Sequence, residues 1–514
     1  MQLLKACAKR KDLAKGIALH VDIQKRGLLG KNPYIGSTLI SMYAKCGALA
    51  KAQQVLEELP IRDVVSWNAL ISGYVQQGQG HEAFNCYERM QREGLSPDEV
   101  TLTCIFKACA RLGTIDRGKQ IHHMISDWGL LENNIALGNS LVDMYAKCGM
   151  LAKAQQMFKE LPLRDVVSWN ALIRGHAQEG HGHGALDCFE QMKSEGISPD
   201  AVTFLLILSV CSSTGDIGKG ESFHEEIVNM GLQKDIVLGN ALVDMYAKCG
   251  FLEKAHKTLK ELPNRNIVTW SALITGYAQH GQGHEALNCF NQMQNEGLAP
   301  DIVTFICVLK CCGNITALEK GEQIHYEILS KGLLKKNTVL GTSLIDMYAK
   351  CGVLTKAKDV LEEILVRDVI SWNAMISAYA QHRQGHEALN CFQRMESEGF
   401  APDVVTFICI LMACGSTGAI EKGHQIHEKI VSGGFLEKDV MVGAALVDMY
   451  AKCGMFTKAK KLLQDLPIRN TICWNALIAG YAKQGLGREA LTCFEQMQRE
   501  GFSPDDITFL CILT

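Results

Sequence analysis

The stretch Leu137–Gly149, LGNSLVDMYAKCG, returns four more times along the chain and decides the fold. Its other copies are Ile35–Gly47 (IGSTLISMYAKCG), Leu238–Gly250 (LGNALVDMYAKCG), Leu340–Gly352 (LGTSLIDMYAKCG) and Val442–Gly454 (VGAALVDMYAKCG). Tryptophans keep step with these copies at intervals of 101 or 102 residues, namely Trp67, Trp169, Trp270, Trp372 and Trp474. So long and accurate a period indicates a repeat architecture, in which stacked units share one continuous core.

Each period divides into three units of unequal length. The units with the tryptophan are 64–98, 166–200, 267–301, 369–403 and 471–505. The units with MYAKCG are 33–63, 135–165, 236–266, 338–368 and 440–470. Units of a third kind occupy 99–134, 201–235, 302–337 and 404–439, with partial copies at 1–32 and 506–514.

Each unit is predicted to form two helices. In 64–98, Ser66 is a favourable N-cap, and Leu70 and Tyr74 follow at helical spacing. The glycines within 77–80 end the first helix, and the turn at 96–98 follows the second. No segment shows the sustained alternation of a strand, so we expect an all-α solenoid of helix hairpins.

The composition is that of a globular chain. Of the 514 residues, 47% are hydrophobic and 21% charged, and the formal net charge is −3. The 21 cysteines recur at fixed places in the repeat, as in Cys148 and Cys188, which favours buried apolar side chains in a reducing compartment. No two cysteines have the CxxC spacing of a zinc site, and no apolar run is long enough to span a bilayer.

The residues resemble a known family. VVSWNALISGYVQQGQGHEAFNCYERMQREGLSPD (Val64–Asp98), with LGNSLVDMYAKCG and the alternating unit lengths, closely resembles the pentatricopeptide-repeat (PPR) proteins of land plants over essentially the whole chain. The alternation resembles the PLS subclass, with the tryptophan unit as P, the third kind as L and the MYAKCG unit as S. The resemblance implies a right-handed superhelix that binds single-stranded RNA in a mitochondrion or chloroplast, roughly one base per repeat. We expect the targeting segment to lie outside this chain.

In the family, the fifth and last residues of a repeat together choose the base, which short amides, hydroxyls and carboxylates can do through hydrogen bonds. The resemblance assigns uridine to Asn68/Asp98, Asn139/Asp165, Asn170/Asp200, Asn373/Asp403 and Asn475/Asp505. It assigns guanosine to Ser37/Asp63, Ser271/Asp301 and Thr342/Asp368, adenosine to Thr103/Asn134 and cytidine to Asn240/Asn266. Aliphatic second residues would sandwich the bases: Val65, Val167, Val268, Ile370 and Ile472.

Four units leave the base undetermined. The L units place Leu205, Ile306 and Ile408 at position five, where no side-chain hydrogen bond can form, and Ala444/Asn470 departs from the pattern. With n for these, the predicted site is G-U-(A)-U-U-n-C-G-n-G-U-n-n-U.

Each of these features also has a simpler structural interpretation. The fifth residues could be polar surface or helix caps, although their variation within a constant framework favours readout. The tryptophans could stack bases, but packing between repeats is favoured. Lysines such as Lys147 could meet phosphate or be solvated near a helix C-terminus, and neither alternative is preferred.

We expect this chain not to be an enzyme. A zinc deaminase would need HxE followed by PCxxC, and the HxE matches at His224–Glu226 and His325–Glu327 sit at a repeated helix position without any CxxC. No cofactor, metal, membrane or small-molecule substrate is expected.

The hypothesis is a specificity factor for C-to-U editing, with a deaminase supplied in trans or lost by truncation. RNA stabilisation, splicing or processing stays open, as does a protein-binding helical scaffold. Because the chain starts and stops within repeats, we also expect it to be a fragment.

Overall fold

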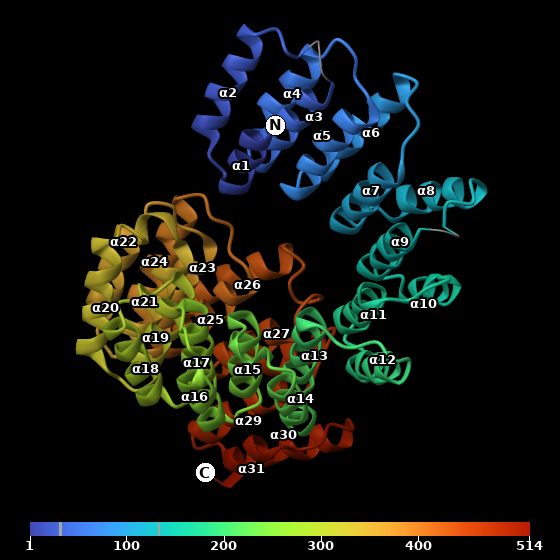
Figure 1. Ribbon diagram of the computed structural model, residues 1–514. Helices are drawn as coiled ribbons and strands as arrows, with labels where there is room; N and C mark the ends of the chain where they lie inside the picture. Colours follow the sequence, from blue (N-terminus) through green and yellow to red (C-terminus); the bar gives the residue numbers. More distant parts are fainter. Residues whose placement is uncertain (30–32, 132–133, 514) are drawn as a thin grey trace. The chain divides into compact units, whose positions relative to one another are not determined.

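The computed structural model describes residues 1–29, 33–131 and 134–513, and within these ranges every regular element is a helix. The prediction of an all-α helical-repeat solenoid is confirmed. The chain divides into two compact units, Met1–Asn264 and Arg265–Thr514, each a stack of helix hairpins (Figure 1). The predicted repeat ends at residues 32 and 514 lie outside the described ranges.

In Met1–Asn264, the first helices of successive repeats pack side by side. They are α1 (Gln2–Arg10), α3 (Pro33–Lys45), α5 (Val64–Gln76), α7 (Glu99–Leu112), α9 (Ile135–Lys147), α11 (Val166–Gln178), α13 (Ala201–Thr214) and α15 (Ile236–Lys248). The second helices are α2 (Leu13–Lys25), α4 (Leu49–Glu58), α6 (Gly80–Arg92), α8 (Ile115–Asp127), α10 (Leu151–Glu160), α12 (Gly182–Ser194), α14 (Ile217–Asn229) and α16 (Leu252–Glu261), and the 3₁₀ turn η1 (Leu232–Lys234) precedes α15.

Arg265–Thr514 repeats this arrangement. Its first helices are α17 (Ile267–Gln279), α19 (Ile302–Asn314), α21 (Thr338–Lys350), α23 (Val369–Gln381), α25 (Val404–Thr417), α27 (Val440–Lys452), α29 (Thr471–Lys483) and α31 (Asp506–Leu513). Its second helices are α18 (Gly283–Asn295), α20 (Leu318–Ser330), α22 (Leu354–Glu363), α24 (Gly385–Ser397), α26 (Ile420–Ser432), α28 (Phe456–Asp465) and α30 (Gly487–Arg499), with η2 (Leu334–Lys336) before α21.

The length of the second helix explains the short S units. In S units such as 135–165 the second helix has 10 residues, as in α10, whereas α12 of the following P unit has 13. Three residues are close to one turn of an α-helix. The S unit is therefore short because its second helix lacks nearly one turn.

The helix ends follow from the residues at the turns. Asp165 precedes α11, and its Oδ1 accepts the backbone N–H of Ser168 at 2.9 Å. Gly149, after α9, has φ = 74°, a left-handed conformation that costs glycine little and other residues more. An Asp or Asn before the first helix and, in most units, a left-handed glycine after it thus delimit the hairpin.

The first helices approach closely because small residues face one another. A Cβ built on Gly175 of α11 would lie 2.8 Å from the Cβ of Ala146 on α9, well inside van der Waals contact. This close approach places α11 beside α9 in the row of first helices of Met1–Asn264 (Figure 1).

The five periodic tryptophans lie in the packed interior between helices. All five are 0–1% exposed, and the ring of Trp169 meets that of Phe158 edge-on at 4.5 Å between centroids. A tryptophan buried in this way cannot stack on a base, so the packing interpretation is confirmed.

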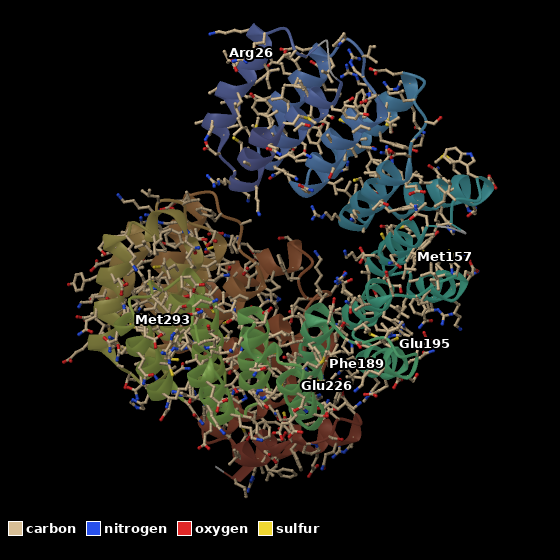
Figure 2. The ribbon with its side chains drawn as sticks, in the orientation of Figure 1. Arg26, Met157, Phe189, Glu195, Glu226 and Met293 are labelled. Atoms are coloured by element: carbon tan, nitrogen blue, oxygen red, sulfur yellow. The ribbon has the colours of Figure 1, made fainter. Side chains whose placement is uncertain are left out.

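Ion pairs join neighbouring repeats on the side of the second helices. The guanidinium of Arg164 lies 3.1 Å from Glu195, and Lys193 Nζ lies 3.1 Å from Glu226. Figure 2 labels both glutamates on the side away from the row of first helices. Partly exposed pairs of this kind contribute about 0–1 kcal/mol each.

Of the cysteines at the repeat positions of Cys148 and Cys188, all predicted to be buried, seven are half-buried, namely the five of the KCG element together with Cys86 and Cys391. Those of the KCG element are half-buried rather than buried, because they follow the last turn of the first helix and turn toward the preceding repeat. The thiol of Cys148, for example, lies 3.7 Å from the backbone oxygen of Cys109. Burial raises the pKa of Cys109 to about 11 and that of Cys211 to about 12, so these are unreactive thiols.

Candidate nucleic-acid interface

The second residue of each P unit is an exposed aliphatic side chain at the start of a first helix. The five predicted residues, Val65, Val167, Val268, Ile370 and Ile472, are 43–63% exposed. The second positions of the L units are exposed as well, as Val100 and Val202 show. Large apolar side chains that a packed fold leaves in solvent at a fixed register suggest a surface that a ligand covers.

The predicted uridine pairs are joined in the structure by direct hydrogen bonds. In each pair the asparagine is only 5–7% exposed, and its Nδ2 donates to Oδ1 of the aspartate. The distances are 2.8 Å for Asn68/Asp98, 2.9 Å for Asn139/Asp165, 3.0 Å for Asn170/Asp200, 2.9 Å for Asn373/Asp403 and 2.9 Å for Asn475/Asp505. Residues about thirty positions apart are therefore brought together as one polar group.

The aspartate of each pair has a second role as the N-cap of the next first helix. Asp200 Oδ1 accepts the backbone N–H of Thr203 at 2.8 Å while it accepts Asn170 Nδ2. Burial acts to raise the pKa of Asp200, but the hydrogen bonds from Thr203 and Asn170 outweigh it, so the pKa lies below its usual value. The carboxylate is thus held ionised, as an acceptor. Capping applies to the last residue of the unit, and the asparagine at position five is not itself a cap.

The hydroxyl-containing pairs are not joined in this way. Ser37 Oγ donates to the backbone oxygen of Tyr34 at 3.2 Å, and Thr342 Oγ1 to that of Thr338 at 2.9 Å. Ser271 Oγ shares a 2.6 Å hydrogen bond with Thr304 Oγ1. Within the described ranges none of these three hydroxyls bonds to its aspartate, and Asp63, Asp301 and Asp368 act as N-caps.

The remaining predicted residues occupy equivalent places. Thr103 is half-buried on α7, and Asn134 caps α9 by accepting the N–H of Leu137 at 2.9 Å. Asn240 is half-buried on α15 of the first compact unit, and Asn266 caps α17 of the second. Ala444, which departs from the pattern, is buried.

One cavity brings two predicted pairs together. It has a volume of about 570 Å³ and lies along the first helices α7, α9, α11 and α13. Both uridine pairs of this region line it, together with the second-position side chains of two units: Asn139, Asp165, Asn170, Asp200, Val167 and Val202. Polar groups that fix hydrogen bonds thus alternate with apolar walls, as in a site for flat polar rings.

Two further cavities are lined by the same kinds of side chain. One of about 490 Å³ is lined by Ser37, Val65 and Asn68, and one of about 400 Å³ by Thr342, Asp368 and Ile370. Ile306, which cannot read a base edge by hydrogen bonds, lines the third cavity as an apolar wall. All three cavities lie where an S unit stands between an L unit and a P unit.

Charged side chains at these cavities are partly neutralised within the fold. Lys147 Nζ lies 2.7 Å from Asp143, and Arg174 lies 3.0 Å from the same carboxylate. Lys107 lines the first cavity. Lys45 has Ser41 four residues before it, where the other S units have aspartate, and both line the second cavity. Lys45 therefore lines a cavity directly, whereas Lys147 is bonded to Asp143 of a cavity wall, where a phosphate would compete with Asp143 for it.

Several lining residues were absent from the sequence predictions. These are the second-position residues of the L units, and Lys107, Asp143 and Arg174 at position nine. The repeat register could have identified the first group, because position two is aliphatic throughout the L units. Position nine varies among the P and L units and carries no comparable signal there, but it is aspartate in four of the five S units, which could have identified Asp143.

The HxE matches belong to the framework. Nδ1 of His224 pairs with the hydroxyl of Tyr246 at 3.0 Å, and Nδ1 of His325 with that of Tyr348 at 2.9 Å. In the part of the chain that the structure describes, no group of three or more His, Cys, Asp or Glu could hold a metal ion. Likewise, no described helix is long and apolar enough to cross a bilayer.

Family models match most of the chain. A model described as "PPR repeat family" matches residues 62–111, 164–213, 265–314, 367–416 and 469–514. A second model, described as "PPR repeat", matches 37–64, 139–166, 240–267, 342–369 and 445–470.

Similar proteins are known from plants. A chloroplastic pentatricopeptide repeat-containing protein of Arabidopsis thaliana is 35% identical over 94% of this chain and 78% of its own length. A mitochondrial one is 33% identical over 100% of this chain and 67% of its own length. The crystal structure of the pentatricopeptide repeat protein PPR10 from maize matches with a TM-score of 0.64 at 20% identity, over 99% of this chain and 80% of that one. PPR10 in complex with an 18-nt psaJ RNA element matches with a TM-score of 0.52 at 17% identity, over 93% of this chain and 80% of that one.

Proposed function

The chain belongs to the pentatricopeptide-repeat family, and from this premise we propose that it binds single-stranded RNA in a sequence-specific manner. The observation that carries the proposal is the cavity of about 570 Å³, in which two Asn–Asp pairs alternate with exposed valines. Paired amides and carboxylates offer hydrogen bonds to a base edge, and the valines offer contact to its faces. The related PPR10 fold has been solved with RNA bound, which supports RNA as the partner.

The proposed register is one base per repeat. The P units and S units read bases through their fifth and last residues, in the order G-U-(A)-U-U-n-C-G-n-G-U-n-n-U. The alternation of 31-, 35- and 36-residue units supports a PLS array. In the L units the aliphatic fifth residues supply walls rather than hydrogen bonds.

The proposed biological role is that of a specificity factor for C-to-U editing in a plant mitochondrion or chloroplast. The chloroplastic and mitochondrial names of the relatives support an organelle. A deaminase would act in trans or from a part of the protein outside this chain. Sequencing organellar transcripts from plants without the gene tests this role, because a lost C-to-U change supports editing and altered transcript ends or introns support stabilisation, processing or splicing.

The proposed binding is tested by fluorescence anisotropy with a labelled 14-nucleotide RNA of the predicted sequence. Its permuted sequence and the same sequence as DNA are the controls, each at two salt concentrations. We expect the permutation to weaken binding at least tenfold, about 1.4 kcal/mol. Equal binding to both RNAs would contradict base readout, and an absence of RNA binding would favour a protein-binding scaffold.

A single substitution tests one repeat. Asn170→Ser replaces an amide that donates to Asp200 by a hydroxyl, as in the repeat with Ser271. We expect the preference at the fifth nucleotide to move from uridine toward guanosine by about tenfold, or 1.4 kcal/mol. Preferences at the other nucleotides serve as the internal control and should not change.

A further inference from the structure

A threonine hydroxyl from the next repeat reaches the reading side chain in most P units. Thr101 Oγ1 donates to Asn68 Oδ1 at 2.6 Å, and Thr406 and Thr508 do the same to Asn373 and Asn475 at 2.6 Å. Each threonine is the third residue of the following L unit and is fully buried. In these repeats the amide is held at both ends, by the aspartate at Nδ2 and by the threonine at Oδ1.

After three of the five S units the equivalent residue is a serine that points elsewhere. Ser168 Oγ donates to the backbone oxygen of Asp165 at 2.8 Å, and Ser371 Oγ to that of Asp368 at 2.8 Å. Asn139 belongs to the S unit that precedes Ser168. Its Oδ1 is buried and has no hydrogen-bond partner within the described ranges. Asn139 is therefore held by its aspartate alone.

One P unit resembles the S unit in this respect. Thr203 Oγ1 bonds to Asp200 Oδ1 at 2.9 Å, as Thr101 Oγ1 also does to Asp98 Oδ1. It makes no bond to Asn170, however, and Asn170 Oδ1 has no hydrogen-bond partner among the described residues. Asn240 Oδ1 also has no partner, but its unit ends in Asn266 rather than an aspartate. Among the five Asn–Asp pairs, the two with an unpartnered carbonyl oxygen, Asn139/Asp165 and Asn170/Asp200, line the same cavity of about 570 Å³.

An unpartnered buried oxygen changes which base the asparagine favours. Leaving a buried acceptor without a hydrogen bond costs about 1–3 kcal/mol, and a ligand that supplies a donor recovers this cost. An asparagine already bonded to threonine gains nothing by turning, so it presents only its second Nδ2 hydrogen. Uracil carries a ring N–H, whereas cytosine has an acceptor at the same ring position.

We propose that the third residue of the following repeat is a positioning residue for base readout, an inference that rests on the RNA binding proposed above. Where its hydroxyl bonds to Asn Oδ1, the asparagine reads only an acceptor on the base and distinguishes uracil from cytosine weakly. In an Asn–Asp pair where it does not, the oxygen turns to the ring N–H of uracil and rejects cytosine. The Asn139 and Asn170 cavity is therefore the strictest uridine site of the array.

The test compares uridine-to-cytidine penalties in binding to the 14-nucleotide RNA. In the wild-type chain we expect the penalty at nucleotides four and five, read by Asn139 and Asn170, to exceed that at nucleotide two, read by Asn68, by about tenfold. Thr101→Val removes the hydroxyl at nearly constant shape and should raise the penalty at nucleotide two by about tenfold. Thr101→Ser, whose hydroxyl can turn to a backbone oxygen as Ser168 does, should act in the same direction.

Ser168→Val is the matched control. It removes a hydroxyl at the same position of the cap but one that does not touch Asn139, so the penalty at nucleotide four should stay constant. A melting curve of each variant verifies that it is folded. An unchanged or smaller penalty at nucleotide two in both Thr101 variants would overturn this inference and leave the proposed function standing. If the wild-type chain binds all these RNAs equally, the proposed function fails with it.

Discussion

Trp169 and Asn170 are neighbours in α11, yet they belong to two regions with opposite properties. Trp169 is buried against Phe158 of the preceding unit, and Asn170 lines the cavity along the first helices. All five P units have tryptophan at position four, whereas position five is asparagine in four of them and serine in Ser271. A residue that fills a packed interior has one acceptable shape, but a cavity wall accepts several polar side chains. The difference separates what makes the solenoid from what would select its ligand.

The largest expected effect on stability comes from the interior region. Trp169→Ala should cost about 3–5 kcal/mol, because the lost ring leaves a cavity in a packed core. Since repeat proteins unfold locally, hydrogen exchange in α11 and its neighbours is the appropriate measurement. Exchange in α23, the equivalent helix of another P unit, is the control. Unchanged exchange in α11 would contradict the assignment of Trp169 to the framework.

Asp200 should give an intermediate effect, because it belongs to both regions. Asp200→Ala removes an N-cap, which costs about 0.5–2 kcal/mol, and should also weaken RNA binding through loss of the partner of Asn170. The folded state lowers the pKa of Asp200, so its stabilising effect is complete above about pH 4 and disappears as the pH falls through the lowered value. Denaturation of both proteins between pH 7 and pH 2 should therefore show the difference shrinking in acid.

Asp216 provides the matched control for this prediction. It caps α14 by accepting the N–H of Lys219 at 3.1 Å, and it lines none of the three cavities described above. Asp216→Ala should lose comparable stability and keep its RNA affinity. Equal losses of affinity in both variants would show that affinity follows stability alone.

The smallest effect on stability should come from the cavity wall. Val167→Ala trims an exposed side chain and should change stability by less than about 0.5 kcal/mol. We expect it to weaken RNA binding about fivefold, or 1 kcal/mol, through lost apolar contact with a base. Val228→Ala is the control, because Val228 is also exposed but lies on the second helix α14. A large loss of stability in Val167→Ala would contradict the separation of the packed interior from the cavity wall.

The sequence was informative about the framework because packing repeats itself. The period of Trp169 and of the MYAKCG stretch predicted the all-α solenoid, which the structure confirms. A further regularity was available: a histidine and a tyrosine 22 or 23 residues apart form a hydrogen bond at each L–S junction, as His122 and Tyr145 do at 2.8 Å. This pair could have been found from spacing alone.

The details of the candidate site could not be obtained in the same way. That Lys147 is neutralised by Asp143 depends on which rotamers meet, and so does the contact of Thr101 with Asn68. Asn139 and Asn170 share a residue type with Asn68, yet their oxygens have different surroundings. Identical residues at identical positions thus acquire different chemistry through a neighbour one repeat away, which a pattern within a single repeat does not contain.

The N-caps limit which residues can stand at the last position of each unit. Every unit that ends between residues 63 and 505 ends in Asp or Asn, and each of these residues accepts a backbone N–H of the following helix. Helix starts tolerate few other side chains without loss of stability. The last position is therefore restricted to two residue types in this array, and most of what distinguishes one repeat from another must lie at position five. A design that changes the base preferences of this chain therefore has many residue types to choose from at position five and only two at the last position.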